Sequence, residues 1–395
     1  MIQKGVNVTG MGCICAAGDS VKSAMNSLYS SVRNCAAPKR IQAKLEVEYP
    51  VFEAASEIPV TDPSATRTSL LALHAVSEAL EQSGLDEREL QKWRVGVCLG
   101  TTVGCTLNNE PFYRDYKAGK NPNVSAIDRY LGNNAALYIA DKLKCKGPTA
   151  TIANACSSGT DAIGLAKSWL ENNLCDIVIA GGADELSRIT YLGFISLLIS
   201  STEACRPFDK NRKGLNLGEG AGIVIMEKSD VSKARGVKTL SNVVGYATFA
   251  DAYHPTAPHP EGIGLTRAIN QALLQAGISL EQIGFINAHG TSTQNNDEVE
   301  GRTIAKLFSD IIPTVSTKSY TGHTLGAAGG IEAVFLIQGL LDQKLPATSG
   351  FEEFDPACEL NPTTSNINVS AEFALSNSLA FGGNNSALIF QGVPE

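Results

Sequence analysis

Residues 151–164 have the sequence Thr151-Ile-Ala-Asn-Ala-Cys156-Ser-Ser-Gly-Thr-Asp-Ala-Ile-Gly164, and this stretch decides the predicted fold. It begins with apolar, β-prone residues, turns at Cys156 and continues through small residues, which predicts a strand, a sharp turn and a thin, buried helix. A cysteine at a helix N-terminus with a basic neighbour has its pKa lowered from about 8.5 towards roughly 7 or below. The alternative is a buried structural cysteine, the usual state of a free thiol.

The composition limits what kind of protein this is. A chain of 395 residues is too long for one ordinary core, and its formal net charge of −8 argues against nucleic acid as a partner, although a local basic patch is compatible with it. Its ten cysteines include no Cys-x-x-Cys pair, which favours reduced thiols in the cytoplasm over disulfides or a zinc site. Residues 1–18 lack the features of a signal peptide, and the most apolar run, 191–199, is far shorter than the roughly 20 residues that span a bilayer. We therefore expect a cytoplasmic protein without a membrane or nucleic-acid partner.

Strand and helix patterns alternate along the chain. Residues 175–184 form a continuous apolar run ending in glycines, typical of a strand buried on both faces. Further strand–helix pairs follow after residues 229–236, where the chain passes from an N-terminal half, 1–232, to a C-terminal half, 233–395. The run Gly218-Glu-Gly-Ala-Gly222 resembles a nucleotide loop, but it precedes a strand instead of joining a strand to a helix. We therefore interpret it as a site of close backbone packing.

Three other stretches look unlike scaffold: Asn287-Ala-His289-Gly-Thr291-Ser-Thr293, the glycine-rich segment 316–330 with Lys318 and His323, and Leu379-Ala-Phe381-Gly-Gly-Asn-Asn385. One cysteine and two histidines in separate loops can divide a reaction between them. The thiolate attacks an acyl thioester, and imidazole N–H groups stabilise an enolate formed as CO2 leaves. A cysteine protease instead needs one histidine with an Asn or Asp that orients it.

These loops resemble those of the β-ketoacyl-acyl-carrier-protein synthases, the elongating condensing enzymes of the thiolase superfamily. The resemblance spans nearly the whole chain and includes Arg206-Pro-Phe-Asp209 and Gly218-Glu-Gly-Ala-Gly222. It implies an α/β thiolase fold, in which two similar halves form a five-layer α-β-α-β-α sandwich that usually dimerises. It also implies decarboxylative condensation of a cysteine-bound acyl group with malonyl-acyl carrier protein. No metal or other cofactor is implied, because the carrier protein supplies the phosphopantetheine arm.

By motif position, the resemblance makes Cys156 the acylated nucleophile. His289 and His323 match the pair that supports malonyl decarboxylation, so that acylation alone would not require His323. Lys318 matches the lysine that orders the second histidine loop.

The resemblance also assigns supporting residues. Thr291 and Thr293 match residues that touch the phosphopantetheine arm. The backbone N–H groups of Cys156 and Phe381 would form the oxyanion hole, and Phe381 matches the gate over the acyl pocket. Asp297 and Glu300 match acidic residues near the lysine, although negative charge at a helix start explains them equally well. The basic loop with Arg206, Lys210, Arg212 and Lys213 is the expected docking site for an acidic carrier protein.

Some positions depart from the common family pattern. Asn154 stands before Ala-Cys156 where threonine is usual, Leu379-Ala380 replaces Phe-Gly before the gate, and Gln294-Asn-Asn296 replaces a turn with Pro and Gly. These differences leave open the acyl chain, the choice between fatty-acid and polyketide or polyene synthesis, and a homodimer or a heterodimer with a ketosynthase-like subunit.

Other functions fit the sequence less well. A non-catalytic chain-length partner would lack the cysteine. A degradative thiolase would carry a second cysteine near the C-terminal glycine loop, and an initiating synthase would have Asn in place of His323.

Overall fold

The computed structural model of the protein describes residues 6–60, 62, 65–104, 110–124, 127–128, 134–308 and 312–393. Within these residues the main sheet has ten strands. They are β1 (Val6–Ile14), β2 (Val95–Gly100), β3 (Thr149–Ile152), β4 (Ile177–Asp184), β5 (Gly220–Lys228), β6 (Ser241–Ala250), β7 (Ile283–Asn287), β8 (Thr314–Val315), β11 (Phe373–Ala380) and β12 (Asn384–Gly392). A separate ribbon pairs β9 (Lys344–Leu345) with β10 (Ile367–Asn368).

The sheet repeats one topology twice. Its order is β3-β2-β4-β5-β1 in the first half and, outwards from the centre, β6-β12-β11-β7-β8 in the second. Strands β1, β2, β3, β4 and β5 correspond, in this order, to β6, β7, β8, β11 and β12. Corresponding neighbours also have the same relative direction. For example, β2 is parallel to β3 and β4, and β7 is parallel to β8 and β11. The halves join where residues 6–8 of β1 pair with residues 241–243 of β6. The two similar halves that the sequence predicts are therefore confirmed, although no sequence repeat marks them.

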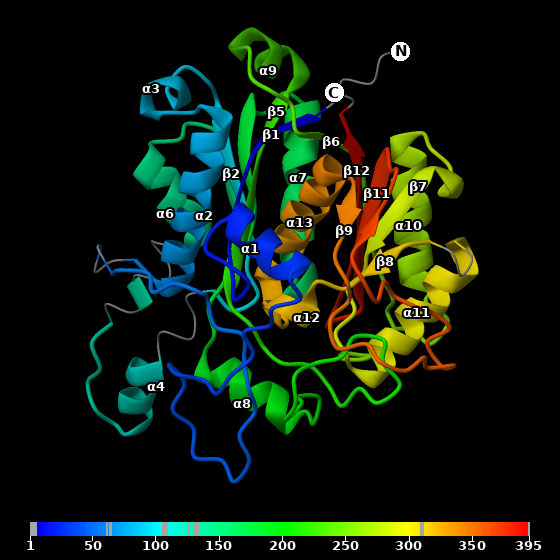
Figure 1. The fold of residues 1–395 in the computed structure, drawn as a ribbon. Coiled ribbons are helices and arrows are strands. Elements are labelled where there is room, and N and C mark those ends of the chain that lie inside the picture. The colour runs from blue at the N-terminus through cyan, green and yellow to red at the C-terminus, as the bar shows by residue number, and fades with distance from the viewer. Residues whose placement is uncertain are drawn as a thin grey trace.

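The helices form three layers around this sheet (Figure 1). α2 (Arg67–Ser83) and α6 (Ala135–Leu143) cover the outer face of the first half, and α10 (Ile263–Ala276) and α11 (Gln294–Phe308) cover that of the second. Between the halves lie α7 (Ser158–Glu171) and α13 (Ala328–Asp342), which both contact strands of each half. This is the predicted five-layer sandwich. The remaining helices are α1 (Val21–Tyr29), α3 (Glu87–Leu90), α4 (Glu110–Lys117), α8 (Arg188–Ser196), α9 (Ser229–Arg235) and α12 (Lys318–Thr321), with 3-10 turns η2 (Ala155–Ser157), η3 (Leu280–Gln282) and η4 (Leu325–Ala327).

The middle layer is packed through glycine. A Cβ on Gly159 of α7 would lie 2.7 Å from the carbonyl oxygen of Gly326 and 2.8 Å from the amide nitrogen of Gly330, so the backbones touch directly. A Cβ on Gly222 would lie 2.2 Å from the Ile331 nitrogen. The small residues after Cys156 thus make a thin helix, and the run 218–222 serves backbone packing, both as the sequence predicts.

The apolar character of α13 follows from its central position. In the described part of the chain, one helical run, Leu325–Asp342, is long and apolar enough to cross a membrane, and 83% of it is buried. Because α13 lies between the two halves of the sheet, its apolar residues form part of the hydrophobic core. Its composition is that of a core helix buried on all sides.

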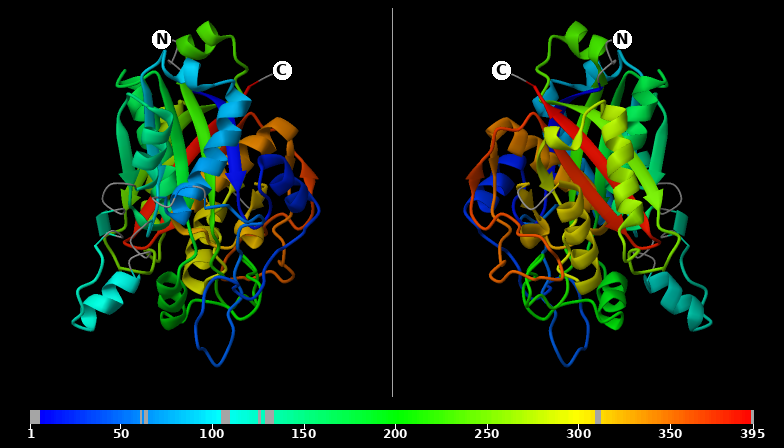
Figure 2. Two further views of the ribbon diagram at one scale, coloured as in Figure 1. Left: turned by 90° about the vertical axis from the view of Figure 1, so that its left-hand side faces the viewer. Right: turned by 90° about the vertical axis from the view of Figure 1, so that its right-hand side faces the viewer.

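Several elements differ from the sequence pattern. α6 and α8 were not predicted; α8 begins at Arg188 after Ser187, whose side chain accepts the N–H of Thr190. The segment 108–129, which is polar and aromatic without a clear period in the sequence, contains α4 but lies partly outside the described residues. α4 and α8 occupy the end of the molecule opposite both termini (Figure 2). The expected boundary at residues 232 and 233 falls within α9.

Candidate active site

Four loops that follow strands converge on one cavity of about 240 Å³. The loops follow β3, β7, β8 and β11. In the sheet, β7 and β8 of the second half occupy the positions that correspond to β2 and β3 of the first. Such strand ends are where α/β sheets usually bind ligands. The predicted catalytic, gate and substrate-binding residues on its wall are Cys156, His289, Thr291, Thr293, His323 and Phe381. The structure therefore brings together the residues that the sequence singled out.

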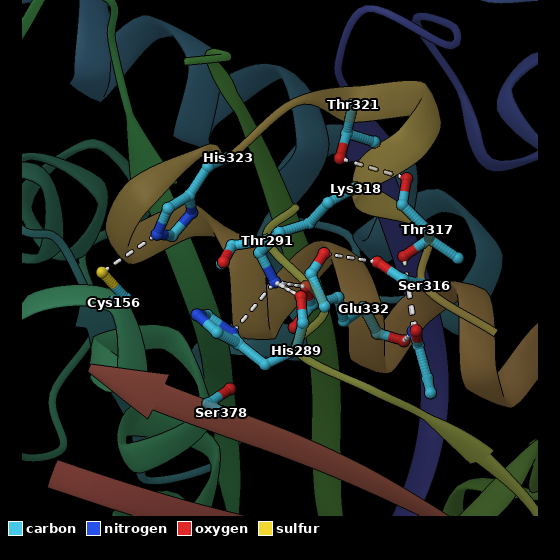
Figure 3. Close-up of polar contacts among 12 residues, drawn as sticks. Cys156, His289, Thr291, Ser316, Thr317, Lys318, Thr321, His323, Glu332 and Ser378 are labelled. Atoms are coloured by element: carbon cyan, nitrogen blue, oxygen red, sulfur yellow. Dashed lines mark hydrogen bonds and ion pairs between the residues drawn. The ribbon is translucent and has the colours of Figure 1, made fainter. Parts of the chain in front are cut away.

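Cys156 lies in η2, directly before α7, as predicted, and its Sγ is 3.0 Å from Nε2 of His323 (Figure 3). Burial raises the pKa of the Cys156 thiol to about 11, although the N–H of Phe381 and the charge of Lys318 act in the opposite direction. At neutral pH the resting thiol therefore keeps its proton. This corrects the low thiol pKa expected from the helix N-terminus, because the desolvation of a fully buried sulfur outweighs the local positive potential.

His323 is the neutral base beside this thiol. Burial, and then the positive charge of Lys318, holds its pKa well below the ordinary value. Its Nδ1 has no hydrogen-bond partner within the described residues, whereas Nε2 faces Cys156. A neutral imidazole in this position can accept the thiol proton.

His289 is held in a single tautomer. The Lys318 Nζ lies 3.0 Å from Nδ1 of His289 and 2.7 Å from its carbonyl oxygen. Because an ammonium group only donates, Nδ1 must accept, and the neutral ring carries its proton on Nε2. Burial, Lys318 and His323 together lower the pKa of His289 well below its usual value. The two imidazole rings are perpendicular, with centroids 5.3 Å apart, so the pair can present N–H donors to one oxygen atom.

The ammonium group of Lys318 is paired with a residue that was not predicted from the sequence. Its ammonium forms a buried ion pair with Glu332 of α13. Glu332 is the one charged residue in the stretch 326–341, and this charge within an apolar run is the signal that could have identified it. Lys318 was expected to order the second histidine loop, but its ammonium bonds to His289 of the first. Its position beside β8, next to β7 in the sheet, explains the difference.

Asp297 and Glu300 shape the backbone of the His289 loop. Glu300 accepts the N–H groups of His289 and Gly290, both at 2.7 Å. Asp297 accepts the N–H groups of Thr291 at 2.9 Å and Ser292 at 3.0 Å. Burial raises the pKa of Glu300 to about 7. Both carboxyl groups belong to the first turns of α11, so they lie at a helix start and also fix the first histidine loop.

Phe381 closes one side of the cavity. Its backbone N–H hydrogen-bonds to the sulfur of Cys156, a position consistent with the predicted oxyanion hole. Its ring stacks on Phe194 of α8, with centroids 5.6 Å apart, and Phe194 lies edge-on to His323 at 6.5 Å. Phe194 was not predicted, because the sequence pattern did not indicate α8. These aromatic contacts give Phe381 the location expected of a gate.

Thr291 and Thr293 line the same cavity with their hydroxyl oxygens 2.9 Å apart. They follow His289 in the loop after β7, so they offer polar groups next to the two histidines. Their predicted contact with a phosphopantetheine arm remains compatible with this position. Within the described residues, no group of three or more His, Cys, Asp or Glu side chains is arranged to hold a metal ion.

The predicted basic docking loop is largely neutralised. Arg212 is 2% exposed and bonds to Asp355 and Glu298, so it cannot meet a partner. Three more ion pairs join the other members to acidic neighbours: Arg206 with Glu352, Lys210 with Glu353, and Lys213 with Glu203. Lys213 also lines the cavity. The expectation of a four-residue basic patch is therefore wrong for Arg212, which is buried, whereas Arg206, Lys210 and Lys213 remain accessible although each is paired.

Comparison with known proteins gives a consistent result. A family model described as the N-terminal domain of β-ketoacyl synthase matches residues 3–231, and one for the C-terminal domain matches residues 240–352. The chain is 35% identical over 409 residues to 3-oxoacyl-[acyl-carrier-protein] synthase 2 of Synechocystis sp., covering 98% of each chain.

Among solved structures, the ishigamide ketosynthase/chain length factor superposes with a TM-score of 0.94 at 29% identity, covering 99% of this chain and 100% of that one. A type II PKS ketosynthase bound to the hexaketide, solved in complex with its acyl-carrier protein, superposes with a TM-score of 0.90 at 27% identity and the same coverage.

Proposed function

The chain belongs to the β-ketoacyl synthase family, and we propose that its two halves divide one condensation between them. The enzyme is an acyltransferase that joins an acyl group to malonyl-acyl carrier protein with loss of CO2, giving 3-oxoacyl-acyl carrier protein in fatty-acid or type II polyketide biosynthesis. The observation that carries the division of labour is the contact of 3.0 Å between Cys156 Sγ and His323 Nε2, beside a His289 whose Nε2 bears a proton.

Acyl transfer begins at the protonated thiol of Cys156. Neutral His323 takes the thiol proton on Nε2 as the sulfur attacks the carbonyl carbon of the incoming thioester. The backbone N–H groups of Cys156 and Phe381 stabilise the oxyanion. When the tetrahedral intermediate collapses, the phosphopantetheine thiol leaves with the proton from His323, and Cys156 carries the acyl group.

Decarboxylation uses the second half. The malonyl thioester carbonyl receives the Nε2–H of His289, so that negative charge can develop on the oxygen as CO2 leaves. In the acyl-enzyme Nε2 of His323 no longer faces a thiol proton, and its Nδ1 has no hydrogen-bond partner within the described residues. The neutral ring can therefore carry its proton on Nε2 and provide the second donor. The enolate carbon then attacks the acyl group on Cys156. The expelled thiolate takes up one proton from solvent, and this restores the thiol.

The substrates arrive on acyl carrier protein, whose phosphopantetheine arm passes Thr291 and Thr293 at the cavity wall. No metal or further cofactor is needed for these steps. The nine cysteines in the described residues are all free, which supports our proposal of a cytoplasmic enzyme. The protein acts as a homodimer or as a heterodimer with a ketosynthase-like subunit.

A heterodimer with a chain length factor is the second candidate assembly. The observation that favours it is the structural similarity to the ishigamide ketosynthase/chain length factor. Because Cys156, His289 and His323 converge on one cavity, this chain would be the catalytic subunit and not the non-catalytic partner.

The test is intact-mass spectrometry after incubation with a panel of acyl carrier proteins of different chain length and unsaturation. We expect one acyl group per chain, located on Cys156 by proteolysis and lost in Cys156→Ala. Cys145→Ala is the matched control, because Cys145 is a partly exposed thiol whose pKa burial raises to about 11 but which does not line the cavity. An acyl group on another residue, or none with any carrier protein, would overturn the proposal.

A further inference from the structure

The nucleophile loop (residues 153–157) and the gate loop (residues 381–385) belong to different halves of the sheet. Beside the N–H of Phe381 on the Cys156 sulfur, one hydrogen bond between two side chains joins them within the described residues. Nδ2 of Asn384 donates to Oδ1 of Asn154 at 2.7 Å. Asn154 stands two residues before Cys156, and Asn384 stands three residues after Phe381. Each amide side chain thus lies within three residues, along the chain, of one of the two backbone N–H groups that face the acyl carbonyl in the proposed function.

The orientation of this contact is determined by a buried carboxylate. Nδ2 of Asn154 donates to Oδ2 of Asp161 at 2.5 Å. Because the Asp161 oxygen accepts this bond and an amide oxygen cannot donate, the amide nitrogen of Asn154 must face Asp161, and its oxygen must face Asn384. Asp161 is 6% exposed and accepts three further hydroxyl groups from three elements, those of Ser157, Tyr246 and Ser386. Asn154 is therefore held in place by the carboxylate of Asp161, which belongs to α7 in the middle layer.

The backbone beside Asn154 also needs external support. Ala155, between Asn154 and Cys156, has a φ of 49°, in the left-handed region that is unfavourable for an alanine. Its carbonyl oxygen accepts the hydroxyl groups of Thr102 at 2.9 Å and Ser158 at 2.6 Å. Such strain persists where the surroundings impose it. The position of the Cys156 N–H therefore depends on the contacts that hold residues 154 and 155.

The gate loop is attached on its other side to the segment after β6. The N–H of Gly382 donates to the carbonyl oxygen of Pro255, and the N–H of Asp251 donates to that of Gly383, both at 2.7 Å. Gly382 and Gly383 have φ values of 88° and 81°, conformations that favour glycine. Among the described residues, the hydrogen bond between Asn384 and Asn154 is the one that joins a side chain of this loop to a side chain of the nucleophile loop.

We propose that Asn154 and Asn384 form an amide clip that sets the spacing between the oxyanion donors of Cys156 and Phe381. The clip makes Asn154 and Asn384 positioning residues for acyl transfer, an inference that rests on the proposed function. It also gives a role to Asn154, which departs from the usual threonine. Decarboxylation does not depend on the clip, because its two donors are held elsewhere: His289 by Lys318 and Glu300, and His323 by the backbone bond from its N–H to the carbonyl oxygen of Asn216 at 2.8 Å.

The test compares both half-reactions in Asn154→Ala, Asn384→Ala and the double variant. The acylation rate is measured by quenched intact-mass spectrometry and decarboxylation by CO2 release from malonyl carrier protein. A displacement of about 1 Å in a reacting geometry costs on the order of 100-fold. We expect each single variant to slow acylation about 10- to 100-fold, the double variant to be no slower than the worse single, and CO2 release to change less than about twofold.

Two further variants separate positioning from general damage. Asn384→Asp keeps the size of the side chain but removes the donor, so it should slow acylation as much as Asn384→Ala does. Asn172→Ala is the control, because it removes an exposed amide that bonds only within the far end of α7. If Asn154→Ala does not fold, the half-buried Asn384 variants alone carry the test.

Each outcome decides the question. Unchanged acylation, additive single effects, or equal loss of acylation and CO2 release would overturn the clip. If the wild-type enzyme forms no acyl-enzyme at all, the proposed function is overturned instead, so the two failures are distinguishable.

Discussion

The two halves of the sheet have the same strand order but supply different chemistry. After β3, the first half presents the reacting sulfur of Cys156, and at the matching point after β8 the second half presents Lys318 and His323. After β2, the first half has the loop that begins at Thr101, and at the matching point after β7 the second half has His289. The repeated topology therefore determines where reactive groups can stand, and the side chains at these points decide what each half does.

Both halves use a buried carboxylate to hold the loop after the second of the corresponding strands, β2 in the first half and β7 in the second. In the first half Asp184 accepts the hydroxyl group of Thr101 at 2.5 Å and the N–H of Thr102 at 2.7 Å. In the second half Glu300 accepts the N–H groups of the His289 loop. The same device thus supports a scaffold loop in one half and a catalytic loop in the other. Variants at Cys156 and His289 should therefore separate the half-reactions, whereas His323 takes part in both.

The largest effect is expected for Cys156→Ala. Among the described residues that line the cavity, Cys156 is the one thiol, so its loss should abolish acyl-enzyme formation and condensation. Intact-mass spectrometry after incubation with acyl carrier protein measures this. A persistent acyl adduct of the same stoichiometry would show that the first half does not hold the acyl group.

His323→Ala should come next, because it removes the acceptor of the thiol proton. General-base catalysis contributes about 100- to 10,000-fold, so acylation at pH 7 should fall in this range. Since the pKa of Cys156 is raised to about 11, the thiolate fraction in the variant rises with pH, and acylation should recover about tenfold per pH unit towards that value.

The wild-type enzyme should lack this steep pH dependence. The sequence alone predicts that His323→Ala acylates normally, and the raised pKa of the thiol is the reason for the different expectation. Normal acylation at pH 7 would restore the simpler role of His323 as a decarboxylation donor only.

His289→Ala should affect the other half-reaction. Loss of one preorganised donor typically costs about 100- to 1,000-fold, or roughly 3–4 kcal/mol, so CO2 release should fall by this factor while acylation stays within a few-fold. His74→Ala is the matched control, since that ring bonds to the carbonyl oxygen of Asp19 outside the cavity. Equal losses in both half-reactions would remove the distinction between the two histidines.

The smallest effect is expected at the cavity mouth. Lys213 lines the cavity but is exposed and paired with Glu203, so Lys213→Glu should raise KM for the carrier protein only a few-fold at low salt and leave kcat unchanged. Lys210→Glu, which reverses a similar exposed pair away from the cavity lining, is the control. Equal KM values for both variants would show that Lys213 does not meet the carrier protein.

The sequence was sufficient for the layers and for the residues at strand ends, because apolar runs followed by Cys156, His289 or His323 are local patterns. It was not sufficient for properties that depend on distant segments. The pKa of Cys156 depends on burial by both halves. Glu332, the partner of Lys318, lies 14 residues further along the chain. Phe194 was missed for the same reason, since its role comes from stacking on Phe381, far away in sequence.

The most direct test of the division between the halves is the rate of CO2 release from malonyl carrier protein by Cys156→Ala, with the wild-type enzyme and His289→Ala measured in parallel. If the second half polarises the malonyl carbonyl by itself, the Cys156 variant should release CO2 within a few-fold of the wild-type rate, although it forms no acyl-enzyme and no condensation product. If CO2 release in Cys156→Ala falls as far as it does in His289→Ala, decarboxylation requires the sulfur, and the two halves do not act separately.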